Sequence, residues 1–486
     1  MPENTFDERG RAEVDDVIIE APGLEGEVTV ERPAGDGTLR GGRSRKALDD
    51  ALGRMEMQTQ REIVIAGPRQ VGHVAEETRG ARRGPRTAMT MTVPGPPRGH
   101  EQAVLSIDEH GVATWHMKGG RSGGRAVRGG QKTRTYVIER TVAPTRGAGR
   151  TRGLVPGLDK VIRVITFPIA SAIGRGARFA AREWDVDRHP PLVRAYGPTG
   201  RLTDLDDDGW KGLSDGGALL FVHGTFSTTE GGFGRLPADT RKELHRRYQG
   251  RVIAYDHPTI ADDPIENARK FFEIVGDRSL KLDIVCHSRG GLVSRSIAER
   301  PGDLAQLAPG VDVRSIVLVG VPNNGTILAE AKHWNELLDR FTTLLNFLPG
   351  PGVSDMLESV LAVIRSIAVQ TVENLEGLDS MAPHGDFVKR LNVATAGAAT
   401  YRAIVSDFEP KNPGLKAWLN DSVRDALFDH KPNDMMVTIE SMAGQNGSSR
   451  FPVTDLREFH PKDAIEHSDY FPEAVTRAAL LDWLPG

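Results

Sequence analysis

The sequence is nearly free of cysteine: of its 486 residues, Cys286 is the single one. One thiol excludes an intrachain disulfide framework and leaves too few thiols for a zinc site built from cysteines. Long apolar runs are also missing, since none reaches the roughly 18 residues of a membrane-spanning helix. The first residues, MPENTFDERGRAEVDD, are polar and lack the apolar core of a secretory signal. These absences predict a soluble cytoplasmic protein.

Charge is unevenly distributed along the chain, although the net charge is only −4. Residues 1–200 carry a net charge of +7 and the remainder −11. The basic excess is greatest in 118–200, with 17 basic against 5 acidic residues. Such a segment suits an anionic surface or a protein partner, and a solvated Gly/Arg-rich loop is the simpler interpretation. It shows no specific nucleic-acid motif, because stacking aromatics are not interleaved with the basic residues.

The first half of the chain has weak and mixed signals. Residues 1–48 are acidic and rich in turn formers, and we expect a weakly ordered segment. Residues 49–150 are expected to form a small β-rich module, with a short helix at its start. Residues 151–213 are expected to be a helical connector and linker. The elements expected here are a helix over 49–62, strands over 87–93, 103–107 and 135–142, and a helix over 158–183 broken at Pro168.

The pattern changes after residue 213. Short apolar runs alternate with helical stretches, which predicts a mostly parallel, doubly wound α/β sheet. The expected strands cover 218–222, 252–255, 282–286, 315–319 and 401–405, and helices are expected over 264–275 and 291–299.

The segment LDIVCHSRGG, residues 282–291, has the context of a nucleophile elbow. A short apolar strand runs into Ser288, and a helix follows. Only small residues fit two positions either side of such a serine; Gly290 meets this requirement, and Cys286 stands where glycine is usual. An ordinary polar turn is the alternative, and the flanking strand and helix favour a nucleophile.

A second segment, ALLFVHGTFS at 218–227, ends an earlier strand with His-Gly-Thr. A tetrahedral intermediate of acyl transfer needs two preorganised N–H donors. We expect the backbone amides of Thr225 and Arg289 to supply them, with Phe226 as the alternative to Thr225. A glycine turn with a structural histidine is the other interpretation of this segment.

Several segments resemble α/β-hydrolases, closely the bacterial lipase/esterase branch. FVHGTFSTTEGGFGRL resembles its oxyanion loop, and LVGVPNNGTIL at 318–328 is similar to a lipase stretch after the next strand. VIAYDHPTIADDPIENA and LDIVCHSRGGLVSR resemble a poorly characterised hydrolase domain family found in bacterial proteins that also carry CHAT protease domains. The resemblance covers 214–486. It implies an α/β-hydrolase domain there, with a Ser, acid, His order of catalytic residues.

The resemblance also implies the other two catalytic residues. NDMMVTIES at 433–441 is similar to the lipase segment that carries the acid, which makes Asp434 the acid and Asp429 the fallback. HSDYF at 467–471 precedes a helix expected over 474–484, which makes His467 the base and His460 the competitor. A turn aspartate and a surface histidine are the ordinary alternatives.

The insert over 329–397 has apolar helical stretches at 334–347 and 353–372. Hydrolases of this type place a cap there, and helices that simply pack on the sheet fit equally well. Metal sites are poorly supported, because neither a Walker pattern nor H-E-x-x-H is present and the acidic run DLDDD lacks the spacing of a calcium loop.

We therefore expect a serine hydrolase that cleaves a small-molecule or lipid ester without a cofactor, using Ser288, His467 and Asp434. Two alternatives stay open: a non-catalytic interaction module on the same fold, and an acyltransferase or amidase with the same residues.

Overall fold

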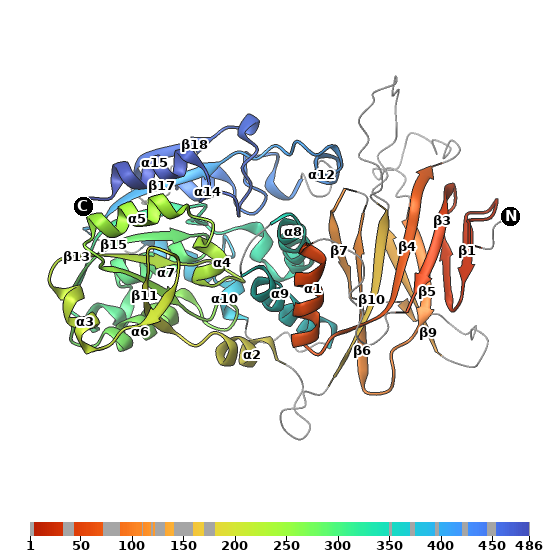
Figure 1. Ribbon diagram of the computed structural model, residues 1–486, viewed down its shortest axis with the longest axis horizontal. Coiled ribbons are helices and arrows are strands. Elements are labelled where there is room, and N and C mark those ends of the chain that lie inside the picture. Colours follow the sequence, from red (N-terminus) through yellow and green to blue (C-terminus); the bar gives the residue numbers. More distant parts are fainter. Residues whose placement is uncertain are drawn as a thin grey trace.

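The computed structural model describes residues 4–32, 43–70, 88–108, 110–117, 120–121, 132–139, 159–169, 180–348, 352–369, 375–393, 398–419, 426–444 and 453–485. Two bodies lie side by side, a β-sandwich near the N-terminus and a larger α/β body near the C-terminus (Figure 1). About half of the basic segment 118–200 lies outside the described residues, so its expected partner is not addressed by the structure.

The sandwich consists of two five-stranded sheets with strand orders β1-β2-β5-β9-β8 and β3-β4-β10-β6-β7. Successive side chains of a strand point to opposite faces of the sheet, which explains how the two sheets pack. Along β5, the side chains of Met89, Met91 and Val93 are buried in the sandwich core together with Ile63 and Ile65 of the other sheet. The strands are β1 (Arg11–Val14), β2 (Val17–Glu20), β3 (Leu24–Glu31), β4 (Gln58–Gln70), β5 (Ala88–Pro94), β6 (His100–Ile107), β7 (Ala113–His116), β8 (Gly120–Arg121), β9 (Thr133–Glu139) and β10 (Lys160–Pro168).

Three expectations for the first half were wrong. The helix expected over 49–62 ends at Arg54, and residues from Gln58 onward form β4. Residues 1–48 contain the ordered strands β1, β2 and β3, because Val17, Ile19 and Val28 fill the sandwich core. The expected helix over 158–183 is instead the strand β10, where β-branched residues favour extended backbone, and no helix begins there before Ala181 among the described residues. The module therefore begins well before residue 49 and ends near Pro168.

The larger body holds an eight-stranded sheet of order β12-β11-β14-β13-β15-β16-β17-β18. The six strands from β14 to β18 in this order are parallel, while β11 pairs antiparallel with both β12 and β14. The chain is thus an α/β protein with a mixed, mostly parallel sheet. The strands are β11 (Leu192–Tyr196), β12 (Leu202–Asp204), β13 (Gly217–Val222), β14 (Val252–Asp256), β15 (Leu280–His287), β16 (Val311–Val319), β17 (Thr400–Ser406) and β18 (Val453–Phe459).

The expected start of this body, residue 214, was too late. Strands β11 and β12 belong to the sheet although they fall in the expected linker. Both are short: Arg194 interrupts the apolar residues of β11, and Leu202 is the one apolar residue of β12, so neither has the apolar run that marks a central strand.

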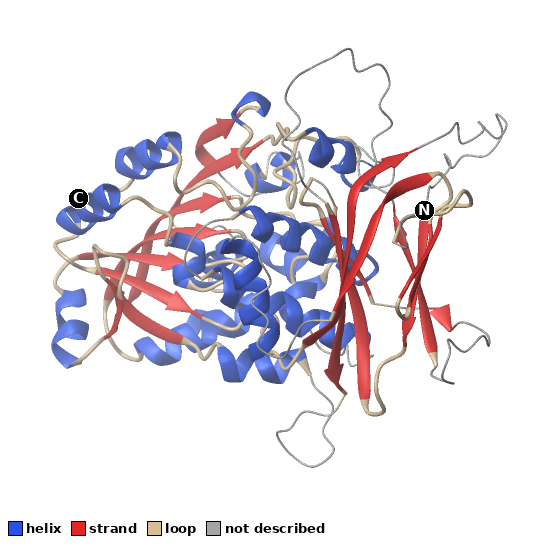
Figure 2. Cartoon of the chain, turned by 45° about the vertical axis from the view of Figure 1, so that its right-hand side comes forward, coloured by secondary structure: helices blue, strands red, loops and turns tan. Residues whose placement is uncertain are grey.

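Helices surround the sheet and fill the space between the two bodies (Figure 2). They are α1 (Arg43–Arg54), α2 (Ala181–Arg188), α3 (Asp207–Ser214), α4 (Thr229–Phe233), α5 (Ala238–Arg247), α6 (Pro264–Val275), α7 (Gly290–Glu299), α8 (Trp334–Phe347), α9 (Val353–Ala368), α10 (Glu376–Asp379), α11 (Asp386–Val393), α12 (Pro413–Leu419), α14 (Ile439–Ala443) and α15 (Ala474–Trp483).

The two long helices of the insert, α8 and α9, lie between the bodies and pack against both. They contact β7, α1 and α2, and the apolar residues of this region join one continuous core with the α/β sheet (Figure 1). The outer face of strand β6 contributes Ala103 and Leu105 to that core, while its inner face contributes Val104 to the sandwich. The insert is therefore enclosed between the two sheets.

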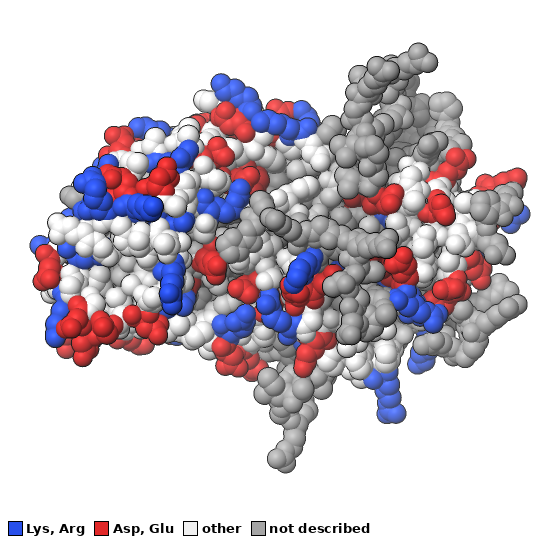
Figure 3. All heavy atoms as spheres, viewed as in Figure 1, with Lys and Arg blue, Asp and Glu red and all other residues white. Residues whose placement is uncertain are grey.

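Within the described part of the chain, every helix is too short or too polar to cross a membrane. On the face drawn in Figure 3, acidic and basic side chains of the described residues are interspersed over the α/β body, and neither sign dominates.

Candidate active site

The turn between β15 and α7 carries Ser288 in a constrained backbone conformation. Its φ is +52°, a left-handed value that is uncommon for a residue with a side chain. Gly290 permits the turn, since a Cβ there would lie 2.3 Å from the carbonyl oxygen of Val222 and 2.4 Å from that of His223. The backbone thus presents the Ser288 hydroxyl at the carboxyl end of the parallel strands.

The structure accommodates cysteine in place of the usual glycine before this turn. The Cys286 side chain is fully buried, and its thiol lies 3.3 Å from the carbonyl oxygen of Val317, to which it donates. Burial raises the pKa of this thiol to about 12. Cys286 is therefore a packing residue that stays a thiol at neutral pH.

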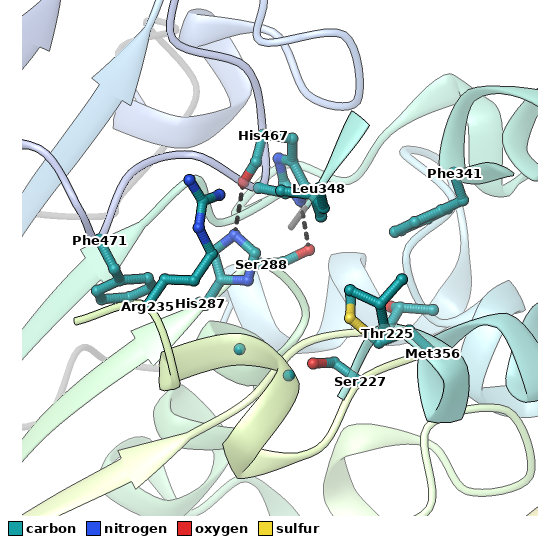
Figure 4. Close-up of a pocket in the computed structure, with 14 residues that line it drawn as sticks. Thr225, Ser227, Arg235, His287, Ser288, Phe341, Leu348, Met356, His467 and Phe471 are labelled. Carbon is teal, nitrogen blue, oxygen red and sulfur yellow. Dashed lines mark hydrogen bonds between the residues drawn. The ribbon is translucent and has the colours of Figure 1, made fainter. Parts of the chain in front are cut away.

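Three side chains form a continuous hydrogen-bonded chain, of which Figure 4 draws Ser288 and His467. The Ser288 Oγ lies 2.9 Å from His467 Nε2, and His467 Nδ1 lies 2.7 Å from Asp434 Oδ2. All three residues are buried. Ser288 follows β15, Asp434 lies in the segment between β17 and β18, and His467 follows β18, so the sheet brings together residues up to 179 positions apart. The structure places the three predicted residues in contact.

Asp434 has partners for both carboxylate oxygens. Oδ1 accepts hydrogen bonds from the backbone amides of Met436 and Val437, at 3.1 and 2.9 Å. Oδ2 accepts the bond from His467 and another from the Tyr470 hydroxyl at 2.8 Å. Burial and the nearby Asp434 carboxylate raise the pKa of Tyr470 well above its usual range, so the hydroxyl remains a donor. These bonds hold the carboxylate in one orientation toward His467.

His287 supports the loop that carries His467. Its Nε2 lies 2.8 Å from the carbonyl oxygen of His467, and the two rings lie 4.9 Å apart. Burial, with His467 nearby, lowers the pKa of His287 to about 3, so this imidazole is neutral and its Nε2–H donates to the carbonyl. The sequence analysis did not assign a role to His287 or Tyr470. Their position within three residues of a predicted site residue was the one signal that could have identified them.

The predicted oxyanion donors lie beside Ser288. Gly224 approaches so closely that a Cβ there would be 2.8 Å from the Ser288 Cβ, and Thr225 lines the same cavity as the serine. Among the described residues, the amides of Thr225 and Arg289 donate to no protein acceptor. The alternative donor is occupied, because the Phe226 amide donates to the Thr259 hydroxyl at 3.1 Å.

The Arg289 side chain does not line the cavity. The guanidinium is fully buried, donating from Nε to the Gly377 carbonyl at 2.9 Å and from Nη2 to the Asn267 side chain at 2.9 Å. Burial lowers its pKa to about 10, so the group is still charged at neutral pH. The Arg289 side chain therefore links the elbow to α10 and α6, and its backbone amide is the group left for the site.

The two fallback residues do not reach this cluster. Asp429 is exposed at a turn with φ of +51°, and His460 is exposed at the end of β18, where it caps a short turn with Asp463. In the part of the chain that the structure describes, no three His, Cys, Asp or Glu side chains gather as a metal site would require. Asp206, in the acidic run DLDDD, instead caps α3 by accepting from the Gly209 amide.

A narrow cavity of about 30 Å³ opens beside the Ser288 hydroxyl (Figure 4). Its lining mixes polar and apolar side chains. The polar ones include Ser227, Arg235 and Ser468, and Arg235 forms an ion pair with Asp469. The apolar ones are Phe341, Leu348, Val353, Met356 and Phe471.

Among solved structures, bacterial lipases are similar to this chain at low identity. The mature lipase BlEst2 of Bacillus licheniformis is 16% identical, with 56% of this chain and 92% of that chain covered and a TM-score of 0.33. Lipase 1 of Pelosinus fermentans is 16% identical, with 54% and 94% covered and a TM-score of 0.36. The Staphylococcus hyicus lipase is 13% identical, with 54% and 90% covered and a TM-score of 0.34.

No curated protein matches the sequence at a significant level. Residues 191–485, more than half of the chain, match a family described as a domain of unknown function, DUF7379. This match begins one residue before β11 and spans the whole eight-stranded sheet. The chain belongs to the DUF7379 family.

Proposed function

We propose that this protein is a serine hydrolase with an α/β-hydrolase domain that cleaves carboxylic esters. The single observation that carries the proposal is the hydrogen-bonded chain from the Ser288 hydroxyl through His467 to the buried carboxylate of Asp434. It ends at a serine in a left-handed conformation, with two available amides nearby. A cluster with a purely structural role rarely combines such a hydrogen-bonded chain, a left-handed serine and two available amides.

The proposed mechanism uses each group in turn. The Ser288 oxygen attacks the ester carbonyl while His467 Nε2 takes its proton, and the positive imidazolium is stabilised by Asp434. The amides of Thr225 and Arg289 donate to the oxyanion of the tetrahedral intermediate. His467 then gives the proton to the departing alcohol. A water molecule, deprotonated by the same imidazole, attacks the acyl-serine and releases the carboxylic acid, which restores Ser288.

The test is hydrolysis of p-nitrophenyl butyrate by the purified protein. We expect Ser288→Ala to lower kcat by roughly 10³-fold or more while the far-UV circular dichroism stays unchanged. The matched control is Ser279→Ala, which removes an exposed hydroxyl just before β15 and should leave kcat unchanged. Full activity in Ser288→Ala would overturn the proposal.

Two expectations from the sequence stay predictions. One is the relationship to hydrolase domains of CHAT-associated bacterial proteins, and the other is an anionic surface or protein partner for the basic segment 118–200.

A further inference from the structure

Most of the apolar residues that line the cavity at Ser288 come from the insert helices. Phe341 and Leu348 come from α8 and its end, and Val353 and Met356 come from α9. The cavity volume is about 30 Å³, whereas pockets that bury a drug-sized ligand measure about 300–1,000 Å³. A long acyl chain therefore fits only if α8 and α9 move away.

Helix α8 is held in place by the edge strand of the sandwich. The Trp115 amide donates to Asp339 Oδ1 at 2.7 Å, and the Trp115 indole donates to Thr342 Oγ1 at 2.9 Å. The Ala113 amide donates to Thr343 Oγ1 at 3.0 Å. All five residues are buried, so moving α8 would leave backbone amides of β7 without partners in a dry interface.

Helix α9 is held from the same side. The guanidinium of Arg365 donates to the carbonyl oxygens of Met55 and Pro168, at 2.8 and 3.1 Å. Ser366 Oγ accepts from the Ala181 amide at 2.9 Å. These bonds connect the last turn of α9 to the end of α1, the end of β10 and the start of α2, so three separate elements fix one helix end.

The opposite end of α9 contacts the helix beside the oxyanion loop. Gly352 packs so tightly that a Cβ on it would lie 2.8 Å from the Cα of Gly231 in α4. A Cβ on Gly231 would in turn lie 3.0 Å from Met356 Sδ. Met356 is therefore packed against α4 where it lines the cavity, and both ends of α9 are in close contact with neighbouring elements.

We propose that α8 and α9 form a fixed wall of the acyl pocket, so that the enzyme takes esters of short acyl groups such as acetyl or butyryl. Met356 and Leu348 set the limit on chain length, and the β-sandwich holds the wall that carries them. This inference rests on the proposed ester hydrolysis and adds the substrate class.

The experiment measures kcat/KM of the full chain for p-nitrophenyl acetate, butyrate, octanoate and palmitate. For the wild type we expect kcat/KM to fall by at least about tenfold from butyrate to octanoate. Met356→Ala enlarges the pocket and should raise the octanoate-to-butyrate ratio by at least about fivefold. Leu348→Ala, a second enlargement, should shift the ratio in the same direction. Met89→Ala, which truncates an equally buried methionine inside the sandwich, should leave the ratio unchanged.

Two results would overturn the inference. One is a wild type that cleaves octanoate as well as butyrate, and the other is a sharp rise of activity once the substrate exceeds its solubility, which would show that the helices move at an interface. If the protein cleaves none of the four esters and a fluorophosphonate fails to label Ser288, the proposed function itself fails, and the short-acyl inference is rejected with it.

Discussion

The turn at Ser288 depends on a single absent side chain. A Cβ at Gly290 would overlap two carbonyl oxygens at the end of β13, at 2.3 and 2.4 Å, so backbone must shift to make room. We expect Gly290→Ala to lower the free energy of unfolding by at least about 2 kcal/mol and to displace the Ser288 hydroxyl from His467. Urea unfolding and esterase activity measure the two effects.

The matched control is Gly212→Ala in α3. Nothing lies within 4 Å of a Cβ at Gly212, and alanine is favoured over glycine in a helix by about 1 kcal/mol. This variant should be as stable as the wild type or slightly more stable. Equal stability of both variants would contradict the steric account of the elbow.

Glu466, the residue before His467, should make stability depend on pH. Burial and the nearby Asp469 raise the pKa of this carboxyl from 4.5 to about 8. The folded state therefore favours the protonated form, and its stabilising contribution, complete below pH 4.5, is lost as the pH rises through about 8. We expect the wild-type Tm to fall between pH 5 and 8.5 more than that of Glu466→Gln, which cannot ionise. Parallel curves for the two proteins would show that Glu466 does not titrate there.

At the scale of single residues, the sequence was most informative where reactive residue types follow one another in the chain order of a hydrolase: serine, acid, histidine. Ser288 was predicted from its local motif, Asp434 and His467 from the resemblance to lipases, and the structure places the three within hydrogen-bonding distance. The supporting contacts of Tyr470 and His287 could not be predicted, because they depend on side-chain orientation across a sheet rather than on local pattern.

At the scale of elements, the interface of α8 with β7 combines packing with hydrogen bonds. Helix α8 thereby covers the edge of the sandwich sheet that β7 forms. Thr342→Val keeps the side-chain volume but removes the acceptor of the buried Trp115 indole N–H. We expect a loss of about 1–3 kcal/mol in unfolding free energy. Thr203→Val, on an exposed position of β12, should change it by no more than about 0.5 kcal/mol. A Thr342→Val variant as stable as its control would show that water reaches the α8–β7 interface or that the interface is loosely packed.

Elements whose apolar residues recur with a clear period could be predicted from the sequence. Elements that depend on pairing with distant strands could not. The expected helix over 334–347 coincides with α8, and that over 264–275 coincides with α6, because each has an amphipathic pattern or a proline start. Strand β10 was expected as helix because both of its faces are buried, so its apolar residues occur in pairs separated by Arg163 and Thr166 and do not alternate with a period of two.

At the scale of the whole molecule, the sandwich and the α/β body share one hydrophobic core through α1, α8 and α9. Unfolding of the sandwich should therefore remove the support of the active-site wall. Met91→Ala truncates a fully buried residue in the sandwich interior and should cost about 2–5 kcal/mol. We expect calorimetry to show a single transition at a lower temperature, with esterase activity lost in the same range. Two transitions, with the temperature of inactivation unchanged, would show that the bodies unfold independently.

This arrangement could not be predicted from the sequence, because the residues whose hydrogen bonds join the bodies are 197 or more positions apart and carry no shared motif. The two-body division was visible in composition, whereas the contact between the bodies depends on which face of β6 and β7 the insert helices cover.

The most direct test of the central claim is labelling by a fluorophosphonate, which reacts with an activated serine, followed by peptide mapping. We expect modification of the wild type at Ser288, no modification in Ser288→Ala, and roughly 10³-fold slower labelling in His467→Ala and Asp434→Asn. Labelling of Ser288 at the same rate in wild type and His467→Ala, or no labelling of the folded wild type, would contradict the account.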